Sequence, residues 1–268
     1  MHLFSAWMIL MIFFAWNPMR AQDNLLYSIP QQTLNLYRLM GDTFRKTEQV
    51  IADLQISSLV TFREYKIYLE AVKKDSSVAF YKTQWPDSAM CPKAVYQTYI
   101  NSSLYDDYPV VGISWKNALN FCRWKTLQDN KKDSLACIYR LPSCSEWLAA
   151  FQHLEKAQVK HDFNKYYSDW TLNAFDESSY DFSGKANVFR YDYVFFPRPH
   201  DQRVLTRMRI LGNSFLHQHR SVYAGFYNYA DQGQRDLGFR YVKDRRMHLA
   251  SGHKTLAESL LNYWKIAP

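Results

Sequence analysis

The chain has 268 residues and a formal net charge of +8, and 17% of its residues are aromatic, including 20 Tyr and 8 Trp. This length is enough for one large domain or two small ones, and the aromatic content excludes a disordered chain. The charge would suit nucleic acid, but no Lys/Arg-rich tail is present, so we expect no nucleic acid as partner. Instead, most Arg side chains should pair with carboxylates or stack on rings.

The first 21 residues predict a secretory signal peptide. Leu3 to Trp16 form an apolar run too short to span a bilayer comfortably, and a polar stretch begins at Gln22. We therefore expect an exported protein of the periplasm or cell envelope. It would contact a membrane only if residues 1–21 stay uncleaved as an anchor. No Cys lies near this junction, which argues against a lipid-modified N-terminus.

Four cysteines follow the signal: Cys91, Cys122, Cys137 and Cys144. In an oxidising compartment they allow more than one pairing, and the sequence does not choose among them. Their spacing is not that of a zinc ribbon. Structural disulfides or inert buried thiols are therefore favoured over a catalytic thiol.

The elements before residue 108 are a polar lead-in, a strand, a helix and a loop. Residues 22–46 are the lead-in, which can add an edge strand, and Ile51–Leu59 has the composition of a strand. A helix begins at Thr61, where T-F-R-E predicts a capping box between Thr61 and Glu64. The Pro- and Ser-punctuated segment 75–107 predicts a loop.

Ser114 predicts the start of another helix. The residue types suit an N-cap at Ser114, and the inner face of the helix is expected to carry Trp115, Leu119, Cys122 and Leu127.

The strongest local signal is Y-R-L-P-S-C-S-E-W-L-A-A-F at 139–151. Pro142 restrains the backbone, and Ser143 and Glu146 form a capping box at the helix start. The helix presents one buried stripe made of Trp147, Phe151 and Leu154. We expect Glu146→Ala to cost about 1 kcal/mol through the lost cap. Capping explains Glu64 and Glu146 better than general acid–base chemistry does.

The second half of the chain has weaker patterns. Residues 161–181 predict long loops, and strands are expected at 188–196, 207–215 and 238–242. Residues 254–264 predict an amphipathic helix with Leu256, Leu260, Leu261 and Trp264 on one side. This tail could dock on its own domain or on a partner. Removing 254–268 would destabilise the monomer in the first case and abolish partner binding in the second.

Four blocks in order resemble the formylglycine-generating-enzyme, or sulfatase-modifying-factor, domain: Ile56–Tyr65, Tyr108–Trp124, Tyr139–Ala150 and Gly238–Arg240. They are similar to that family's E-V-T-N-x-E-Y, P-V-x-x-V-S-W-x-x-A, R-L-P-T-E-A-E-W and G-F-R patterns. The resemblance covers residues 47–243 and implies an irregular α+β, C-type-lectin-like fold, followed by a tail at 244–268. It implies framework roles for Thr61, Glu64, Ser114, Trp115, Arg140, Pro142, Glu146, Trp147, Gly238 and Arg240.

The chemistry implied by the resemblance does not carry over to this chain. Enzymes of the family oxidise a sulfatase cysteine to formylglycine, using two copper-binding cysteines that follow an R-G-G-S-F/W motif. The matching stretch, Arg209–Arg220, contains no cysteine, and His217 falls near the first expected thiol. Copper(I) prefers thiolate, so we expect no catalytic residue, metal or cofactor here. In the segment that resembles the calcium site, Arg190 replaces an acid and would repel the ion.

Three interpretations follow. The favoured one is a non-catalytic, exported structural or binding component of the bacterial envelope, as in gliding-motility and type IX secretion proteins of this domain family. It would bind a protein partner, or a glycan, through Arg190, Arg209, His217, His219 and Arg220. The second is a metal-dependent oxidase with a relocated site, since H-x-H on a strand puts His217 and His219 on one face. The third is a lectin-like glycan binder, suggested by fold analogy alone.

Overall fold

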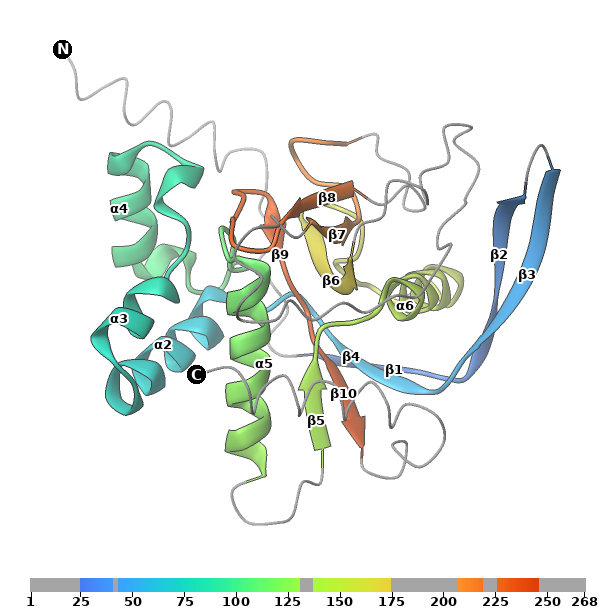
Figure 1. Ribbon diagram of the computed structural model, residues 1–268, viewed down its shortest axis with the longest axis horizontal. Helices are drawn as coiled ribbons and strands as arrows, with labels where there is room; N and C mark the ends of the chain where they lie inside the picture. The colour runs from blue at the N-terminus through green and yellow to red at the C-terminus, as the bar shows by residue number, and fades with distance from the viewer. Residues whose placement is uncertain (1–24, 41–42, 131–136, 175–206, 219–225, 246–268) are drawn as a thin grey trace.

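Two four-stranded sheets and one long hairpin carry the fold of the described chain (Figure 1). The computed structural model describes residues 25–40, 43–130, 137–174, 207–218 and 226–245. The first sheet is antiparallel, in the order β1 (Leu26–Ile29), β4 (Leu54–Ser57), β10 (Val242–Arg245) and β5 (Cys137–Arg140). The second has the order β8 (Phe226–Tyr229), β7 (Arg207–Leu211), β6 (Ser168–Ala174) and β9 (Leu237–Gly238).

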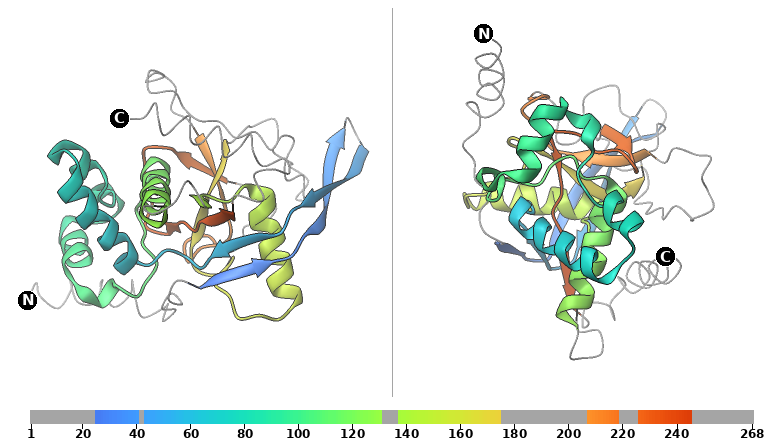
Figure 2. Two further views of the ribbon diagram at one scale, coloured as in Figure 1. Left: turned by 90° about the horizontal axis from the view of Figure 1, so that it is seen from below. Right: turned by 90° about the vertical axis from the view of Figure 1, so that its left-hand side faces the viewer.

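The predicted lead-in is mostly strand. Strand β1 lies at the edge of the first sheet, as expected, but β2 (Gln32–Met40) and β3 (Thr43–Ile51) form a hairpin that was not predicted. This hairpin projects from the end of the molecule opposite to helices α2–α4 (Figures 1 and 2). Val50 is 64% exposed there. Strands in a half-buried sheet are recognised in a sequence by alternating apolar and polar residues. Because this hairpin projects from the sheets, that alternation is not required of it, and the pattern did not predict it.

The predicted loop at 75–107 is wrong. After α2 (Phe62–Asp75), the chain forms α3 (Val78–Thr83), the 3₁₀ turn η1 (Ser88–Met90), α4 (Lys93–Asn101) and the 3₁₀ turn η2 (Ser103–Tyr105). Ser77, Asp87 and Ser102 each accept a backbone N–H at the start of one of these pieces. The Ser, Asp and Pro residues that suggest a loop are thus the caps and breaks between short helices.

Helices α5 (Trp115–Asp129) and α6 (Cys144–Lys156) confirm their predicted starts. Ser114 accepts the N–H of Asn117, and Ser143 and Glu146 form both hydrogen bonds of a capping box. Leu127 departs from the prediction, because it is 59% exposed rather than part of the inner face of α5. None of the described helices is long and apolar enough to cross a bilayer.

The loops predicted for 161–181 contain a central strand. Strand β6 pairs with both β7 and β9, and an irregular register between Trp170 and Ala174 hides its period in the sequence. The predicted strand at 238–242 is divided between β9 in one sheet and β10 in the other. Phe239, between them, packs against Phe121 of α5 with ring centroids 5.3 Å apart. The signal, the strand at 188–196 and the helix at 254–264 lie outside the described residues.

The four cysteines are thiols and form no disulfide with one another, as one of the two favoured interpretations holds. Cys122, Cys137 and Cys144 are buried, whereas Cys91 is half-buried. Burial raises the pKa of Cys91 and, much more, that of Cys122, so neither is an activated nucleophile.

These exposures predict the labelling pattern of the folded protein. Iodoacetamide at mildly alkaline pH should modify Cys91 alone, because a thiol reacts only when the reagent can reach its thiolate. Mass spectrometry of tryptic peptides, with a denatured sample as control, measures this. Labelling of Cys122 or Cys144 in the folded protein at the rate seen in denaturant would contradict it.

Candidate functional site

The R-L-P-S-C-S-E motif builds a buried charge cluster at the start of α6. Arg140 is 0% exposed, and its guanidinium binds both carboxylate oxygens of Glu146 at 2.6 and 2.7 Å and Asp244 of β10 at 2.6 Å. Burial alone would lower the pKa of Arg140, but the two carboxylates outweigh it and raise the pKa. Glu146 also accepts the Ser143 N–H at 2.7 Å, so one side chain caps the helix and neutralises Arg140.

The G-F-R block supplies a second buried arginine. Arg240 donates to Asp169 of β6 at 3.0 Å, to Asp162 at 3.1 Å and to the Ser57 carbonyl at 3.2 Å. Trp147 of α6 donates its Nε1–H to the same Asp169 oxygen at 2.8 Å. Burial raises the pKa of Asp169 to about 6, although Arg240 and Trp147 both favour the ionised carboxylate. This cluster joins α6 to both sheets.

The framework roles implied by the resemblance stay a prediction, and the structure gives the burial and contacts of these residues. All ten residues are buried: Thr61, Glu64, Ser114, Trp115, Arg140, Pro142, Glu146, Trp147, Gly238 and Arg240. Thr61 caps α2, but Glu64 does not complete the expected box; instead its carboxylate pairs with Lys125 of α5 at 3.0 Å. The indole of Trp115 donates to the Thr171 carbonyl at 2.7 Å. We therefore place the candidate binding site elsewhere.

The loop after β7 carries the candidate site. Gly212 begins it with φ +88°, a left-handed conformation that favours glycine. Phe215 N–H then bonds to the Tyr166 carbonyl at 3.0 Å and holds the loop against the domain. This geometry brings Ser214 and His217 to Asp236, which lies between β8 and β9.

One carboxylate oxygen of Asp236 organises the cluster. It accepts the Ser214 hydroxyl at 2.5 Å and lies 3.1 Å from His217 Nδ1. Ser214 and Asp236 are buried, whereas the His217 side chain is 41% exposed. The geometry turns Nδ1 toward the carboxylate and places Nε2 on the ring edge that faces away from it.

This arrangement is not a nucleophile–base pair. In a Ser-His-Asp triad the serine donates to the imidazole, but Ser214 donates to Asp236 and is fully buried. His217 Nε2 can accept a hydrogen bond from a ligand or coordinate a metal. Among the described residues, no three His, Cys, Asp or Glu side chains gather in a way that could hold a metal ion.

The other predicted binding residues are separated from this cluster or lie outside the described chain. Arg209 is buried within β7, and its carbonyl accepts the Thr171 hydroxyl at 2.9 Å. Arg190, His219 and Arg220 fall outside the described residues. Asp236 and Ser214 were not predicted, because nothing in the sequence links an Asp to a His 19 residues earlier.

The family comparison agrees with this architecture. The family model described as "Sulfatase-modifying factor enzyme 1-like domain" matches residues 36–176, more than half of the chain. The chain belongs to this family. The match includes Arg140, Glu146 and Trp147 but ends before β7, so the loop with His217 lies beyond it. The expected domain limits, 47–243, stay a prediction.

Two solved structures share the fold. A structure titled "Crystal Structure of CarF" is 12% identical with a TM-score of 0.50, covering 82% of this chain and 98% of that one. "Structure of PvdO from Pseudomonas aeruginosa" is 13% identical with a TM-score of 0.50, covering 82% of this chain and 94% of that one. With the family match, they confirm the predicted α+β fold of the sulfatase-modifying-factor type. No curated protein matches the chain.

Proposed function

We propose that this family member is an exported, non-catalytic protein that acts as a structural or binding component of the bacterial envelope. Its setting would be like that of gliding-motility and type IX secretion proteins. One observation carries the proposal: the 209–220 stretch, where the family's copper thiols are expected, contains no cysteine, and its His217 and buried Ser214 both contact Asp236 instead. Imidazole and carboxylate do not replace two thiolates in copper(I) and oxygen chemistry.

The positions of the existing cysteines support the same proposal. Cys122 lies on α5, Cys137 on β5, and Cys144 on the first turn of α6, where its Sγ is 3.3 Å from the Thr171 hydroxyl. Each is buried, and none belongs to the 212–218 loop. A thiol pair relocated among them would lack access to a protein substrate.

We propose that the loop itself binds a protein partner. His217 presents Nε2, a ring nitrogen that can hydrogen-bond to a partner, and Leu216, beside it, is 41% exposed. An apolar side chain next to a positioned polar group is a common composition at protein interfaces. Tight anchoring through Gly212 and Phe215 would keep the loop preorganised, which lowers the entropy cost of association.

Measuring metal content and oxygen consumption of the purified protein tests the non-catalytic assignment. After incubation with copper(I) and a cysteine peptide of the sulfatase type, we expect no formylglycine product and no oxygen uptake above a no-protein control. Co-purification from the membrane fraction should recover a partner that is reduced with His217→Ala or Leu216→Ser but retained with the distant control Val50→Ser. Stoichiometric copper with peptide oxidation would overturn the proposal.

A metal-dependent oxidase is the second candidate function. The favouring observation is the Asp236-held imidazole, since a carboxylate behind a metal-binding His is a common supporting arrangement. His219, two residues on, would supply a second ligand. Copper or iron bound stoichiometrically, and lost in both His217→Ala and His219→Ala, would establish it. Glycan-array binding that vanishes on changing Arg190 or Arg198 would instead support the lectin-like alternative.

A further inference from the structure

Residues of α2, α3 and α5 line an apolar groove. Figure 1 shows where these three helices lie. Its volume is about 720 Å³, and its walls include Val72 of α2, Phe80 of α3 and Trp124 and Leu127 of α5. Phe80 and Trp124 are half-buried, and Leu127 is 59% exposed. A groove between helices that is lined by apolar side chains suits the apolar face of another helix.

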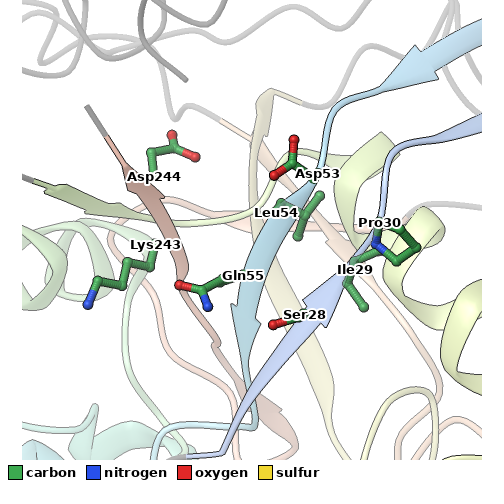
Figure 3. A pocket seen from close by; sticks show the side chains of 8 residues that line it. All are labelled: Ser28, Ile29, Pro30, Asp53, Leu54, Gln55, Lys243 and Asp244. Atoms are coloured by element: carbon green, nitrogen blue, oxygen red, sulfur yellow. The ribbon is translucent and has the colours of Figure 1, made fainter. Parts of the chain in front are cut away.

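A second depression in the described part of the chain has different chemistry. It has a volume of about 350 Å³ and lies at strands β1, β4 and β10. Figure 3 shows that Ser28, Gln55 and Lys243 lie across these strands, with Asp53 and Asp244 near one end. An apolar helix face would desolvate these polar groups without pairing them, so this pocket is unsuited to it.

The described chain ends near the C-terminal end of α5, the helix that forms one wall of the groove. Arg245, the last residue of β10, is the register partner of Cys137 in β5. Cys137 in turn exchanges hydrogen bonds of 2.7 and 3.2 Å with the side chain of Asn130, the C-cap of α5. Leu127 and Gln128, in the turn before this cap, line the groove. The ends of β10 and α5 accordingly lie at the same side of the molecule (Figure 1).

We propose that residues 254–264 of the same chain occupy this groove as an amphipathic helix. About ten residues separate Arg245 from Leu256 and span up to ~33 Å, enough to pass around the end of α5. The helix would be ~16 Å long and would place Leu256, Leu260 and Trp264 along one face. The tail would then be a further layer on α2, α3 and α5, rather than the arm that engages a partner.

Hydrogen exchange of the full chain tests the docking. Leu260→Asp should speed amide exchange in α3 and in the last turn of α5 by roughly tenfold or more, because it removes the central apolar contact. Asn262→Asp adds the same charge on the opposite helix face and should leave exchange unchanged. Leu127→Asp, on the exposed wall, should reproduce the effect, and the double variant should show no further increase.

Three results would overturn the proposal. One is unchanged exchange at α3 and α5 in Leu260→Asp. Another is an effect of Leu260→Asp that adds fully to that of Leu127→Asp, since independent sites do not share a contact. The third is protection that depends on protein concentration, which would mean that the tail docks on a second copy of the chain.

Discussion

Arg240→Met is expected to destabilise the fold by about 3–5 kcal/mol, because it leaves buried carboxylates without their cation. Arg240 pairs with Asp169 and Asp162, and both Arg240 and Asp169 have fully buried side chains. The methionine replaces the stem of the arginine but cannot bind the carboxylates or the Ser57 carbonyl. Urea unfolding followed by tryptophan fluorescence measures the change in free energy of unfolding.

The loss should also depend on pH. The folded-state pKa of Asp169 is already about 6, above its ordinary value of 3.8, and removing Arg240 raises it further. A carboxyl group whose pKa is raised in the folded state contributes most to folding stability below its unfolded-state pKa, where it is protonated. This contribution is lost as the pH rises through the folded-state pKa, because the buried group must then ionise. The destabilisation caused by Arg240→Met should therefore be smaller at pH 4 than at pH 8.

A double variant isolates the buried charge as the cause. Asp169→Asn in the Arg240→Met background removes the charge but keeps an acceptor for Trp147 Nε1. We expect this double variant to be more stable than Arg240→Met alone at pH 8. Equal stability of the two proteins, or a pH-independent loss in Arg240→Met, would show that packing rather than charge explains the effect.

Glu146→Ala is expected to cost about 3–5 kcal/mol, well above the value for a helix cap alone. This cost is higher than the one expected from the sequence, because Glu146 binds the fully buried Arg140 through both carboxylate oxygens in addition to capping α6. After the substitution Asp244 alone would balance Arg140, and the Ser143 N–H would lose its acceptor. Thermal and urea unfolding of purified variants measure the loss.

Ser143→Ala is the matched control for Glu146→Ala. It removes the other half of the capping box but leaves the Arg140–Glu146 pair, so it should cost only about 1 kcal/mol. Glu146→Gln keeps an acceptor for the cap but removes the charge. Its loss of folding stability should therefore lie between those of Ser143→Ala and Glu146→Ala. If Glu146→Ala and Ser143→Ala lower the free energy of unfolding by the same amount, the Arg140–Glu146 ion pair contributes no net stability to the fold.

Local signals predicted the helix starts well. The caps at Thr61, Ser114 and Ser143 depend on residues three apart, so the information for each lies within one turn. The stripe on α6 is also local, and Trp147 and Leu154 are buried as its spacing predicts. Helix α3 was missed because its 6 residues make fewer than two helical turns, and β6 was missed because a bulge breaks its period.

The candidate site could be predicted only in part. Resemblance to the family pointed to the stretch that contains His217, and the same resemblance revealed the missing thiols. The cluster itself needs Asp236, which arrives from the other side of β8 and accepts from both Ser214 and His217. Arg209 was grouped with His217 by proximity in sequence, but β7 buries it.

The sequence by itself determined the family, the capped helices α2, α5 and α6, and the lack of cysteine after Cys144. Those features are set by residue identity and by spacings within a few turns. Only the tertiary structure decided the partners of the two buried arginines: Arg140 meets an Asp 104 residues away, and Arg240 meets one 71 residues away. Such pairs arise from sheet order and depth of burial, which no short sequence pattern encodes. The tertiary structure likewise shows that Glu146, predicted as a helix cap, also neutralises the buried cation Arg140.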